Sequence, residues 1–374
     1  MRVDRVVKIL IIGEGVFLED HLTLGELESA NSLTSHRKHP TSKDVAALAG
    51  VAQSTVSYVM NGSRPVSKAT KDKIMSAMKK LNYQPNTAAR VLRTSKTQLI
   101  AVLETITADS DGTIIPPYLA TIAEESRKRN FDIILSATSE GPAALTRLSG
   151  RSSCDGFIIM DVEKNDPRIE VASKLEIPSV IFGHPNRSFG LDTIYFDYEA
   201  AAKLIVDTLA SSGHRHIVFI KPDSEGREDK FKSFVLFYRC GVMRARQLGI
   251  DVAIIRIGSS GWRGISVSKK EILMNCRDRL AIVSRSPQDF EPLHRILEQE
   301  HLRIGIEVSL IGVFDDPVAK SFQFPVANVS PRPEFVSRRV VDTLINRIEG
   351  SVDNQIIEAV KPLGLNSRCT LAHF

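Results

Sequence analysis

The sequence predicts an α/β protein in which a small basic helical head precedes two doubly wound, parallel-sheet lobes. From Gln98 onward, short apolar runs of strand length alternate with stretches of helical spacing, which is typical of parallel sheets covered by helices. Between Thr41 and Lys96 the apolar spacing is helical, and ten Lys or Arg accompany two acids. That stretch carries +8 in a chain of net charge +5, so the positive charge is confined to it.

Composition sets broad limits. The 374 residues, 43% hydrophobic and 25% charged, are ordinary for a soluble globular protein and suffice for two or three domains. No apolar run approaches the roughly 18 residues that span a bilayer, and the opening apolar patch is too short for a signal peptide. We therefore expect a cytoplasmic protein without a membrane partner. The cysteines are far apart without metal-ligand spacing, so we expect reduced thiols, no metal and no cofactor: Cys154, Cys240, Cys276 and Cys369.

Residues 1–40 are expected to be an N-terminal extension whose role the sequence does not indicate. The apolar run from Val6 to Ile12, followed by Gly13-Glu14-Gly15, resembles the start of a dinucleotide fingerprint. Leu18 stands in place of the third glycine, and the roughly 30-residue unit such a site needs would run into the basic segment. Residues 31–40 are polar and rich in breakers, which indicates a linker.

The basic segment opens with two predicted helices. Thr41 and Asp44 have the spacing of a capping box, and Gly50 can end the first helix in a left-handed conformation. The expected buried stripe of this helix is Val45, Leu48 and Ala49. The second helix is expected from Gln53 to Met60, with an apolar inner face of Val56, Val59 and Met60 and a polar outer face of Gln53, Ser54, Thr55, Ser57 and Tyr58.

Two short helices joined by a glycine turn predict a helix-turn-helix whose second helix can enter a DNA major groove. A plain helical hairpin with a solvated outer face is the alternative, but such a hairpin needs no cluster of cations. Ser67 is expected to cap a third helix that closes the core with Ile74, Met78 and Leu81. Its first lysines either meet phosphates or are ordinary solvated side chains: Lys68, Lys71 and Lys73.

The runs D-V-A-x-x-A-G-V-x-x-S/T-T-V-S-x-V-x-N-G, from Asp44 to Gly62, and L-N-Y-Q-P-N-T-A-A-R-V-L-R-T, from Leu81 to Thr94, resemble the DNA-binding head and hinge of the lactose/galactose repressor family. The resemblance implies base reading by Gln53, Ser54 and Tyr58. It implies backbone contacts by Thr55, Ser57 and Asn61, with Arg64 beside them. Ala52 replaces a common capping serine, and Tyr58 replaces a common arginine, so a bidentate contact to guanine is unavailable.

In this family the segment after Pro85 is a hinge helix that pairs with its dimer mate and inserts a leucine into the minor groove. Asn86 to Thr94 fits, with Ala89 at the close-approach position and Leu92 as the wedge. An apolar wedge can unstack a base step while Arg90 and Arg93 neutralise phosphates. The alternative is that Leu92 is an ordinary core residue, against which its basic flanks argue.

Nine strands and four long helices are expected in the rest of the chain. The strands are Leu99 to Leu103, Asp132 to Leu135, Gly156 to Met160, Ser179 to Phe182, Ile194 to Phe196, His216 to Ile220, Ala253 to Ile257, Ala281 to Ser284 and Val308 to Val313. The helices are Pro117 to Arg129, Tyr198 to Ser212, Phe234 to Leu248 and Glu334 to Glu349. Nine strands exceed one comfortable sheet, which favours two lobes with a cleft between them.

The resemblance extends over nearly all of residues 41 to 372, through landmarks such as C-D-G-F-I-I from Cys154 and V-S-L-I-G-V-F-D-D from Val308. It implies two lobes resembling periplasmic sugar-binding proteins, with a small effector in the cleft. Asp315 and Asp316 follow a strand, where a carboxylate can accept hydroxyls from a sugar or nucleoside. A paired carboxylate also raises a hydrolase, but no matched acid and nucleophile lies nearby.

The expected effector contacts are Asp315, Tyr238 and Trp262. Tyr238 stands where the family often has a ligand-holding arginine, and Ser284-Arg285-Ser286-Pro287 replaces a usual Asn-Asp pair. Gly258 to Gly264 is an unusual loop, and its Trp262 either stacks on a sugar ring or merely packs. A sugar and a nucleobase both remain candidates for the effector, as does the loss of effector binding.

These observations predict a homodimeric, sequence-specific transcription repressor that binds a pseudo-palindromic DNA operator and responds to a small molecule. The expected domains are an extension (1–40), a helix-turn-helix (41–84), a hinge (85–97) and a two-lobed effector and dimerisation domain (98–374). Residues 351–374 lack a leucine-heptad tail, which favours a dimer over a tetramer. The alternatives are a sugar-binding protein without DNA function and an α/β enzyme, whereas the predicted regulator is not an enzyme.

Overall fold

The computed structural model describes residues 40–61, 64–83, 96–106, 112–137, 140–151, 153–222, 228–351 and 354–374. The described residues form two compact units, one before and one after a division at Arg90, and each is considered by itself. Residues 1–39 of the predicted extension and 85–95 of the predicted hinge, with Ala89 and Leu92, fall outside the described residues.

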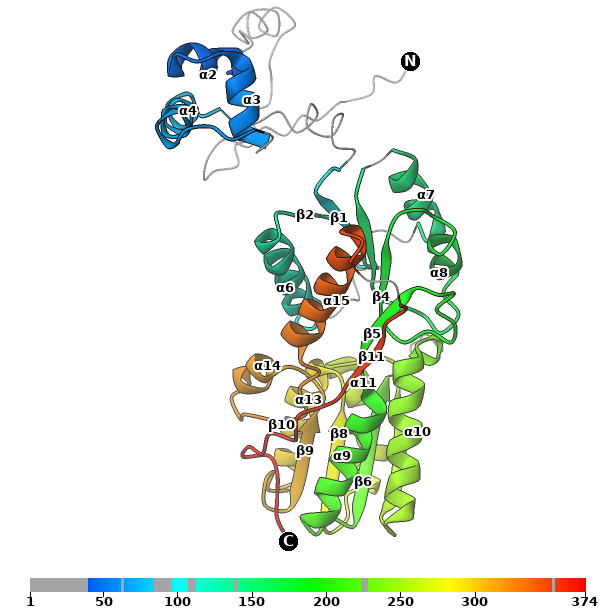
Figure 1. Cartoon of the computed structure of the whole chain (residues 1–374). Helices are drawn as coiled ribbons and strands as arrows, with labels where there is room; N and C mark the ends of the chain where they lie inside the picture. Colours follow the sequence, from blue (N-terminus) through cyan, green and yellow to red (C-terminus); the bar gives the residue numbers. More distant parts are fainter. Residues whose placement is uncertain are drawn as a thin grey trace, which may run out of the picture. The chain divides into compact units, whose positions relative to one another are not determined.

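The first unit consists of three helices, α2 (Ser42–Ala49), α3 (Gln53–Asn61) and α4 (Lys68–Leu81) (Figure 1). The predicted caps are confirmed. Asp44 Oδ2 accepts the Thr41 backbone N–H at 2.7 Å, and Ser67 Oγ accepts the Thr70 N–H at 3.3 Å. Gly50 ends α2 with φ +66°, a left-handed conformation that costs glycine little.

A small apolar core holds the three helices together. Its fully buried members come from all three: Val45, Ala46, Val56, Ile74 and Ala77. The prediction that Leu48 is buried was wrong, because this side chain is 50% exposed. The face of α2 that packs against α3 and α4 is centred on Val45 and Ala46, so Leu48 lies at its edge.

The second unit contains two parallel sheets, which confirms the predicted fold class. The six-stranded sheet has the order β11-β5-β4-β3-β1-β2. Its strands are β1 (Leu99–Leu103), β2 (Asp132–Ser136), β3 (Gly156–Ile159), β4 (Ser179–Phe182), β5 (Asp192–Phe196) and β11 (Ile357–Val360). The five-stranded sheet has the order β10-β9-β8-β6-β7. Its strands are β6 (His216–Pro222), β7 (Asp251–Ile257), β8 (Leu280–Ser284), β9 (Val308–Gly312) and β10 (Ala327–Asn328).

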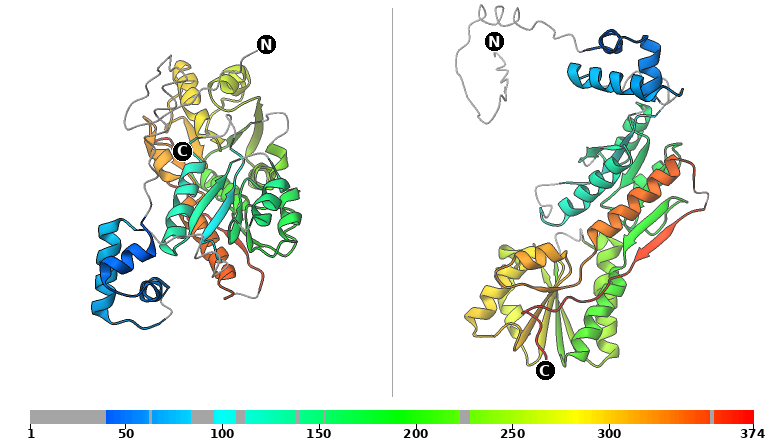
Figure 2. Two further views of the ribbon diagram at one scale, coloured as in Figure 1. Left: turned by 90° about the horizontal axis from the view of Figure 1, so that it is seen from above. Right: turned by 60° about the vertical axis from the view of Figure 1, so that its left-hand side comes forward.

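Helices cover both faces of each sheet, as continuous apolar strands require (Figure 1). On the six-stranded sheet, α6 (Ile115–Lys128) and α15 (Pro333–Ile348) lie on one face and α7 (Pro142–Gly150) and α8 (Pro167–Ala172) on the other. The right-hand view of Figure 2 shows α15 alongside α6, with which it packs.

The five-stranded sheet is covered in the same way. On one face lie α9 (Tyr198–Ser211) and α10 (Lys232–Gln247). The other face packs against α11 (Trp262–Val267), α12 (Lys269–Met274), α13 (Phe290–Gln299) and α14 (Asp316–Ser321). Two short 3₁₀ turns complete the unit, Glu228–Lys230 and Pro287–Asp289. A search of the described residues for a bilayer-spanning helix finds no stretch with the needed length and apolar character.

The six-stranded sheet with its helices forms the first lobe, and the five-stranded sheet with its helices forms the second. The chain passes between these two lobes three times. Asp197 joins β5 to α9, residues 330–332 join the second lobe to α15, and residues 361–364 lead from β11 back to the second lobe. There Asn366 pairs with Asn328, and the Thr370 hydroxyl donates to the carbonyl of Leu310 at 2.7 Å. Because all three connections leave the strands at one end, they border a cleft between the lobes.

Candidate functional site

The outer face of α3 presents a polar stripe. Gln53, Ser54, Ser57 and Tyr58 are spaced i, i+1, i+4 and i+5, which places them on one side of the helix. Val56 points the other way into the core. Gln53 and Ser54 are exposed, and Ser57 and Tyr58 are half-buried, like Thr55 on the flank. The structure therefore brings Gln53, Ser54, Ser57 and Tyr58 together on one surface, with Thr55 at its edge.

Two contacts hold side chains of this stripe. Gln53 Nε2 donates to Ser42 Oγ at 2.9 Å, which links the start of α3 to the start of α2. The Arg64 guanidinium lies over the Tyr58 ring, 5.1 Å from its centroid, within cation–π range. Ala52 offers no side-chain cap, and its carbonyl accepts the Thr55 N–H at 2.9 Å.

The described part of this unit also carries exposed cations, of which Arg64 lies beside the stripe. They are Lys43, Arg64, Lys68, Lys71, Lys73, Lys79 and Lys80. The first turn of α4 contains no acid, so its free N–H groups and Lys68 and Lys71 add to a positive potential. A surface of this kind suits a polyanion.

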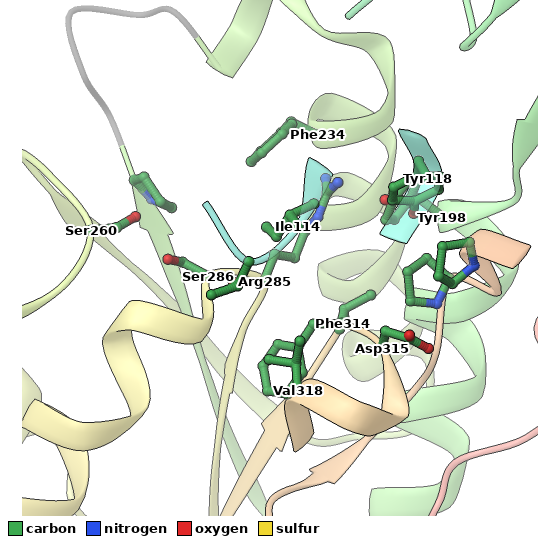
Figure 3. Close-up of a pocket in the computed structure, with 15 residues that line it drawn as sticks. Ile114, Tyr118, Tyr198, Phe234, Ser260, Arg285, Ser286, Phe314, Asp315 and Val318 are labelled. Atoms are coloured by element: carbon green, nitrogen blue, oxygen red, sulfur yellow. The ribbon is translucent and has the colours of Figure 1, made fainter. Parts of the chain in front are cut away.

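A cavity of about 250 Å³ occupies the cleft of the second unit (Figure 3). It is bounded by residues from α6 of the first lobe, by the starts of α9 and α10, and by the carboxyl ends of β8 and β9. Much of its wall is apolar or aromatic, with Ile114, Phe234, Phe314 and Val318 among its members. The polar members converge from both lobes: Thr113, Tyr118, Tyr198, Ser260, Arg285, Ser286 and Asp315.

Asp315 is the one predicted effector residue that lines this cavity. Its Oδ1 accepts the Asp316 N–H at 2.9 Å and the Ser330 hydroxyl at 3.0 Å, so the carboxylate is fixed in position. Neighbouring Asp316 instead accepts Arg368 Nη2 and Asn366 Nδ2, both at 2.8 Å. Of the two carboxylates, only Asp315 lines the cavity, and Asp316 instead pairs with the chain's own Arg368 and Asn366.

Arg285 enters the cavity from the end of β8 and is only 9% exposed. Its guanidinium carbon lies 3.9 Å from the Tyr198 ring centroid and 3.8 Å from that of Phe234. Its Nη1 has no hydrogen-bond partner among the described residues. Asp289, fully buried, braces the adjoining loops by accepting the Ser284 hydroxyl at 2.6 Å and the Gly261 N–H at 2.7 Å.

Tyr118 reaches the cavity from α6. Burial, followed by the nearby Tyr198 and Asp315, raises its pKa well above the usual value, while Arg285 acts in the opposite direction. The phenol therefore stays protonated and can donate a hydrogen bond. The described residues contain no group of three or more His, Cys, Asp or Glu that fits a metal ion.

Tyr238 and Trp262, the other two expected effector contacts, do not line the cavity. Tyr238 is 3% exposed in the core of α10, and its hydroxyl donates to the Ile220 carbonyl at 3.0 Å. Trp262 is the first residue of α11 rather than part of a loop, is 48% exposed, and lies beside the Arg295 guanidinium at 5.5 Å. Neither side chain is placed to touch a ligand there.

The sequence-based list of site residues omitted Arg285, Tyr118 and Tyr198. The rule that selected Asp315, a polar residue directly after a parallel strand, applies equally to Arg285 after β8 and to Tyr198 after β5. Tyr118 follows no strand, and only its position on α6 brings it to the cleft.

Both units are similar to known protein families. Residues 41–86 match the family described as "Bacterial regulatory proteins, lacI family", and residues 206–368 match a "Periplasmic binding protein-like domain". The HTH-type transcriptional regulator AglR of Rhizobium meliloti (strain 1021) is 30% identical over 334 residues, which cover 84% of this chain and 88% of that protein.

Solved structures show the same fold. The lac repressor dimer bound to operator and the anti-inducer ONPF aligns with a TM-score of 0.72 at 21% identity, covering 89% of this chain and 99% of that one. The complex of the transcriptional regulator CelR with cellobiose aligns with a TM-score of 0.62 at 22% identity, covering 88% and 99%. With its capped helix-turn-helix, its two parallel-sheet lobes and these relatives, the chain belongs to the lacI family of bacterial regulatory proteins, which are DNA-binding transcription regulators.

Proposed function

We propose that this regulator is a homodimeric repressor in which α3 of each protomer enters the major groove of one half-site of a pseudo-palindromic operator. The exposed polar stripe of α3, flanked by cations and held on a capped three-helix core, supports this most directly. A two-fold symmetric dimer presents two identical recognition helices, so its site carries the same symmetry.

The residues of the stripe divide into two roles in this proposal. Gln53, Ser54 and Tyr58 read base edges, whereas Thr55, Ser57, Asn61 and Arg64 contact the phosphate backbone. Gln53 suits adenine, whose N6 and N7 match its amide. Phosphate contacts fix the register of the helix without reading sequence.

The proposed domains keep the boundaries expected from the sequence: the helix-turn-helix at 41–84, the hinge at 85–97 and the effector domain at 98–374. Within the hinge, Ala89 allows close approach of the partner helix and Leu92 is the minor-groove wedge. Such a wedge bends DNA at the centre of a palindrome and enlarges the contact surface.

A small molecule of the sugar type occupies the cleft and biases the arrangement of the two lobes. The cavity supports this with its aromatic walls and the fixed carboxylate of Asp315, and CelR, of the same fold, was solved with cellobiose. A ligand that touches both lobes favours one of their arrangements and so changes operator affinity. A nucleobase is the other effector class expected, and thermal unfolding of the full chain with added nucleobases tests it.

The remaining expectations follow from this role. A regulator of this kind acts by binding, so we expect neither catalysis nor a cofactor. Because its partner is chromosomal DNA, we propose that it works in the cytoplasm.

Selection from a pool of random DNA duplexes with the full chain tests the proposal. We expect enriched duplexes that share a palindromic motif, and we expect Gln53→Ala to lose the preference at one base pair in each half-site. Gln247→Ala, an exposed glutamine at the end of α10, is the matched control and retains the motif. A pool without enrichment would instead favour a ligand-binding protein without DNA function.

A further inference from the structure

The Arg285 side chain is an unusual component for a cavity otherwise suited to a neutral ligand. It is 9% exposed, and it lies between the rings of Tyr198 and Phe234 in Figure 3. Two rings whose centroids are each within 3.9 Å of one guanidinium carbon cannot share a face without overlapping. The Tyr198 and Phe234 rings therefore lie on different sides of the guanidinium, and its nitrogens are left for hydrogen bonding.

That edge lacks a partner from the described chain. Nη1 is buried and makes no hydrogen bond, and no described carboxylate forms an ion pair with Arg285. Asp315, the acid that shares the cavity, is held by Ser330 and by the backbone at the start of α14. A guanidinium stays charged at every physiological pH, so the site contains a buried cation with an N–H group available to a ligand.

We infer that the effector is an acid, a polyhydroxylated compound whose carboxylate or phosphate binds the edge of Arg285. This inference deepens the proposed function and rests on the cleft being the effector site. The planar fork of arginine matches two oxygens of either anion, and stacked rings hold that fork in one orientation. Sugar acids and sugar phosphates share this chemistry.

The other polar groups of the cavity, Asp315 and Tyr118, determine the orientation in which the ligand binds. Asp315 carries a negative charge that repels an anion and accepts hydroxyl protons, so the neutral hydroxyls lie toward it. The protonated phenol of Tyr118 adds a donor on the side of the first lobe. About 250 Å³ lies below the roughly 300–1,000 Å³ of typical small-molecule sites, which favours a monosaccharide-sized acid over an oligosaccharide.

Thermal unfolding of the full chain with paired ligands tests the inference. The probes are D-galacturonate, D-gluconate and D-glucose 6-phosphate, compared with D-galactose and D-glucose. We expect at least one acid to raise the wild-type Tm by about 5 °C at a concentration near one hundred times Kd, and the neutral sugars to have no effect. The response to carboxylates and to the phosphate distinguishes the two sources of the anion.

Variants separate binding from folding. Arg285→Gln removes the charge and should abolish the acid-induced shift, whereas Arg246→Gln, an exposed arginine on α10, should retain it. Arg285→Lys keeps the charge without the planar fork and should give a smaller shift that still prefers acids. It serves as the test if Arg285→Gln fails to unfold cooperatively.

Three results would overturn the inference. They are equal stabilisation by a neutral sugar, an undiminished acid shift in Arg285→Gln, and the absence of a shift with every acid. Each of these leaves the operator selection unaffected, so the regulator proposal would stand. Failure to select any duplex would instead contradict the regulator proposal, whatever the ligands do.

Discussion

At the scale of single residues, Tyr58 distinguishes the proposed DNA-reading face of α3 from one that carries arginine at this position. The ring is half-buried on the outer face of α3, and Arg64 lies over it from the loop before α4. A phenol offers one hydroxyl and an apolar ring, whereas arginine offers a bidentate pair of donors to guanine. In the proposed operator complex, Tyr58 would therefore read its base pair through van der Waals contact and a single hydrogen bond.

Replacing Tyr58 by Arg should change the preferred base pair at one position of each half-site toward guanine. A bidentate contact discriminates by about 1–3 kcal/mol, which corresponds to roughly a tenfold to hundredfold change in relative affinity. Competition between duplexes that differ at that position measures it. An identical preferred sequence in both proteins would show that residue 58 reads no base.

Glu104 makes stability depend on pH. Burial, followed by the charge of Asp161, raises the pKa of its carboxyl to about 8, and Arg168 only partly opposes this because it is bonded to Asp166 at 2.7 Å. The folded state thus retains a proton that the unfolded state releases near pH 4.5. The contribution of Glu104 to stability is then greatest below pH 4.5 and falls as the pH rises toward 8.

Glu104→Gln should therefore be more stable than the wild type at pH 8.5, and the difference should disappear as the pH falls toward 4.5. Each pKa unit corresponds to about 1.4 kcal/mol, so we expect a gain of about 3 kcal/mol after partial relaxation of the site. Urea unfolding at both pH values measures it, with the exposed Glu298→Gln as the control. A gain that does not vary with pH would contradict this assignment.

The sequence identified residues whose position depends on local rules and missed those that depend on packing. Asp315 follows from its place after β9, and the polar face of α3 follows from helical spacing. Tyr238 was expected in the effector site because of its position in the chain. It lies in the core because α10 turns that side toward β6, and no local pattern reveals this.

At the scale of elements, the turn between α2 and α3 decides how the recognition helix is presented. Gly50 adopts φ +66°, and a Cβ placed there would have open space around it. The cost of a side chain at this position is therefore conformational and not steric, at about 1 kcal/mol.

Gly50→Ala should accordingly destabilise the helix-turn-helix through backbone strain alone, because the added methyl group contacts no neighbouring atom. Amide hydrogen exchange in α2 and α3 should quicken by roughly fivefold, and by less in Gly50→Asn because asparagine tolerates the left-handed conformation. Gly249→Ala, with φ +72° and equally open space in the other unit, is the matched control. Unchanged exchange in Gly50→Ala would show that the turn does not limit the stability of the head.

The four long helices and nine of the strands were predictable, the edge strands β2 and β7 included, whereas β10 and β11 were not. The predicted strand from Leu99 to Leu103 matches β1, and the predicted helix from Tyr198 to Ser212 matches α9 within one residue. By contrast, β10 has two residues and β11 is an edge strand whose pattern alternates weakly. Those two strands form because the crossing segments place them beside β9 and β5, a property of tertiary structure.

At the scale of the whole molecule, three chain crossings connect the lobes that border the cleft. A ligand that contacts Tyr118 of one lobe and Asp315 of the other can favour one lobe arrangement, and linkage then requires reciprocity. If the effector changes the operator affinity by a certain factor, the operator must change the effector affinity by the same factor. That factor is on the order of 5- to 150-fold.

Titrating the selected operator with and without effector, and the effector with and without operator, tests that equality. Asp315→Asn should weaken effector binding and leave operator affinity without effector close to the wild-type value, because the head is a separate unit. Unequal factors in the two titrations would mean that the cleft ligand and the operator do not act through one equilibrium.

The central claim is that the head binds a specific DNA sequence, and the ratio of affinities for the selected duplex and a scrambled duplex of equal length tests it most directly. We predict a ratio of at least about 10³ at physiological salt. Both affinities should fall as salt rises, with a slope of log K against log salt near −5 if about six phosphates are contacted per dimer. Equal affinity for the two duplexes would contradict the account.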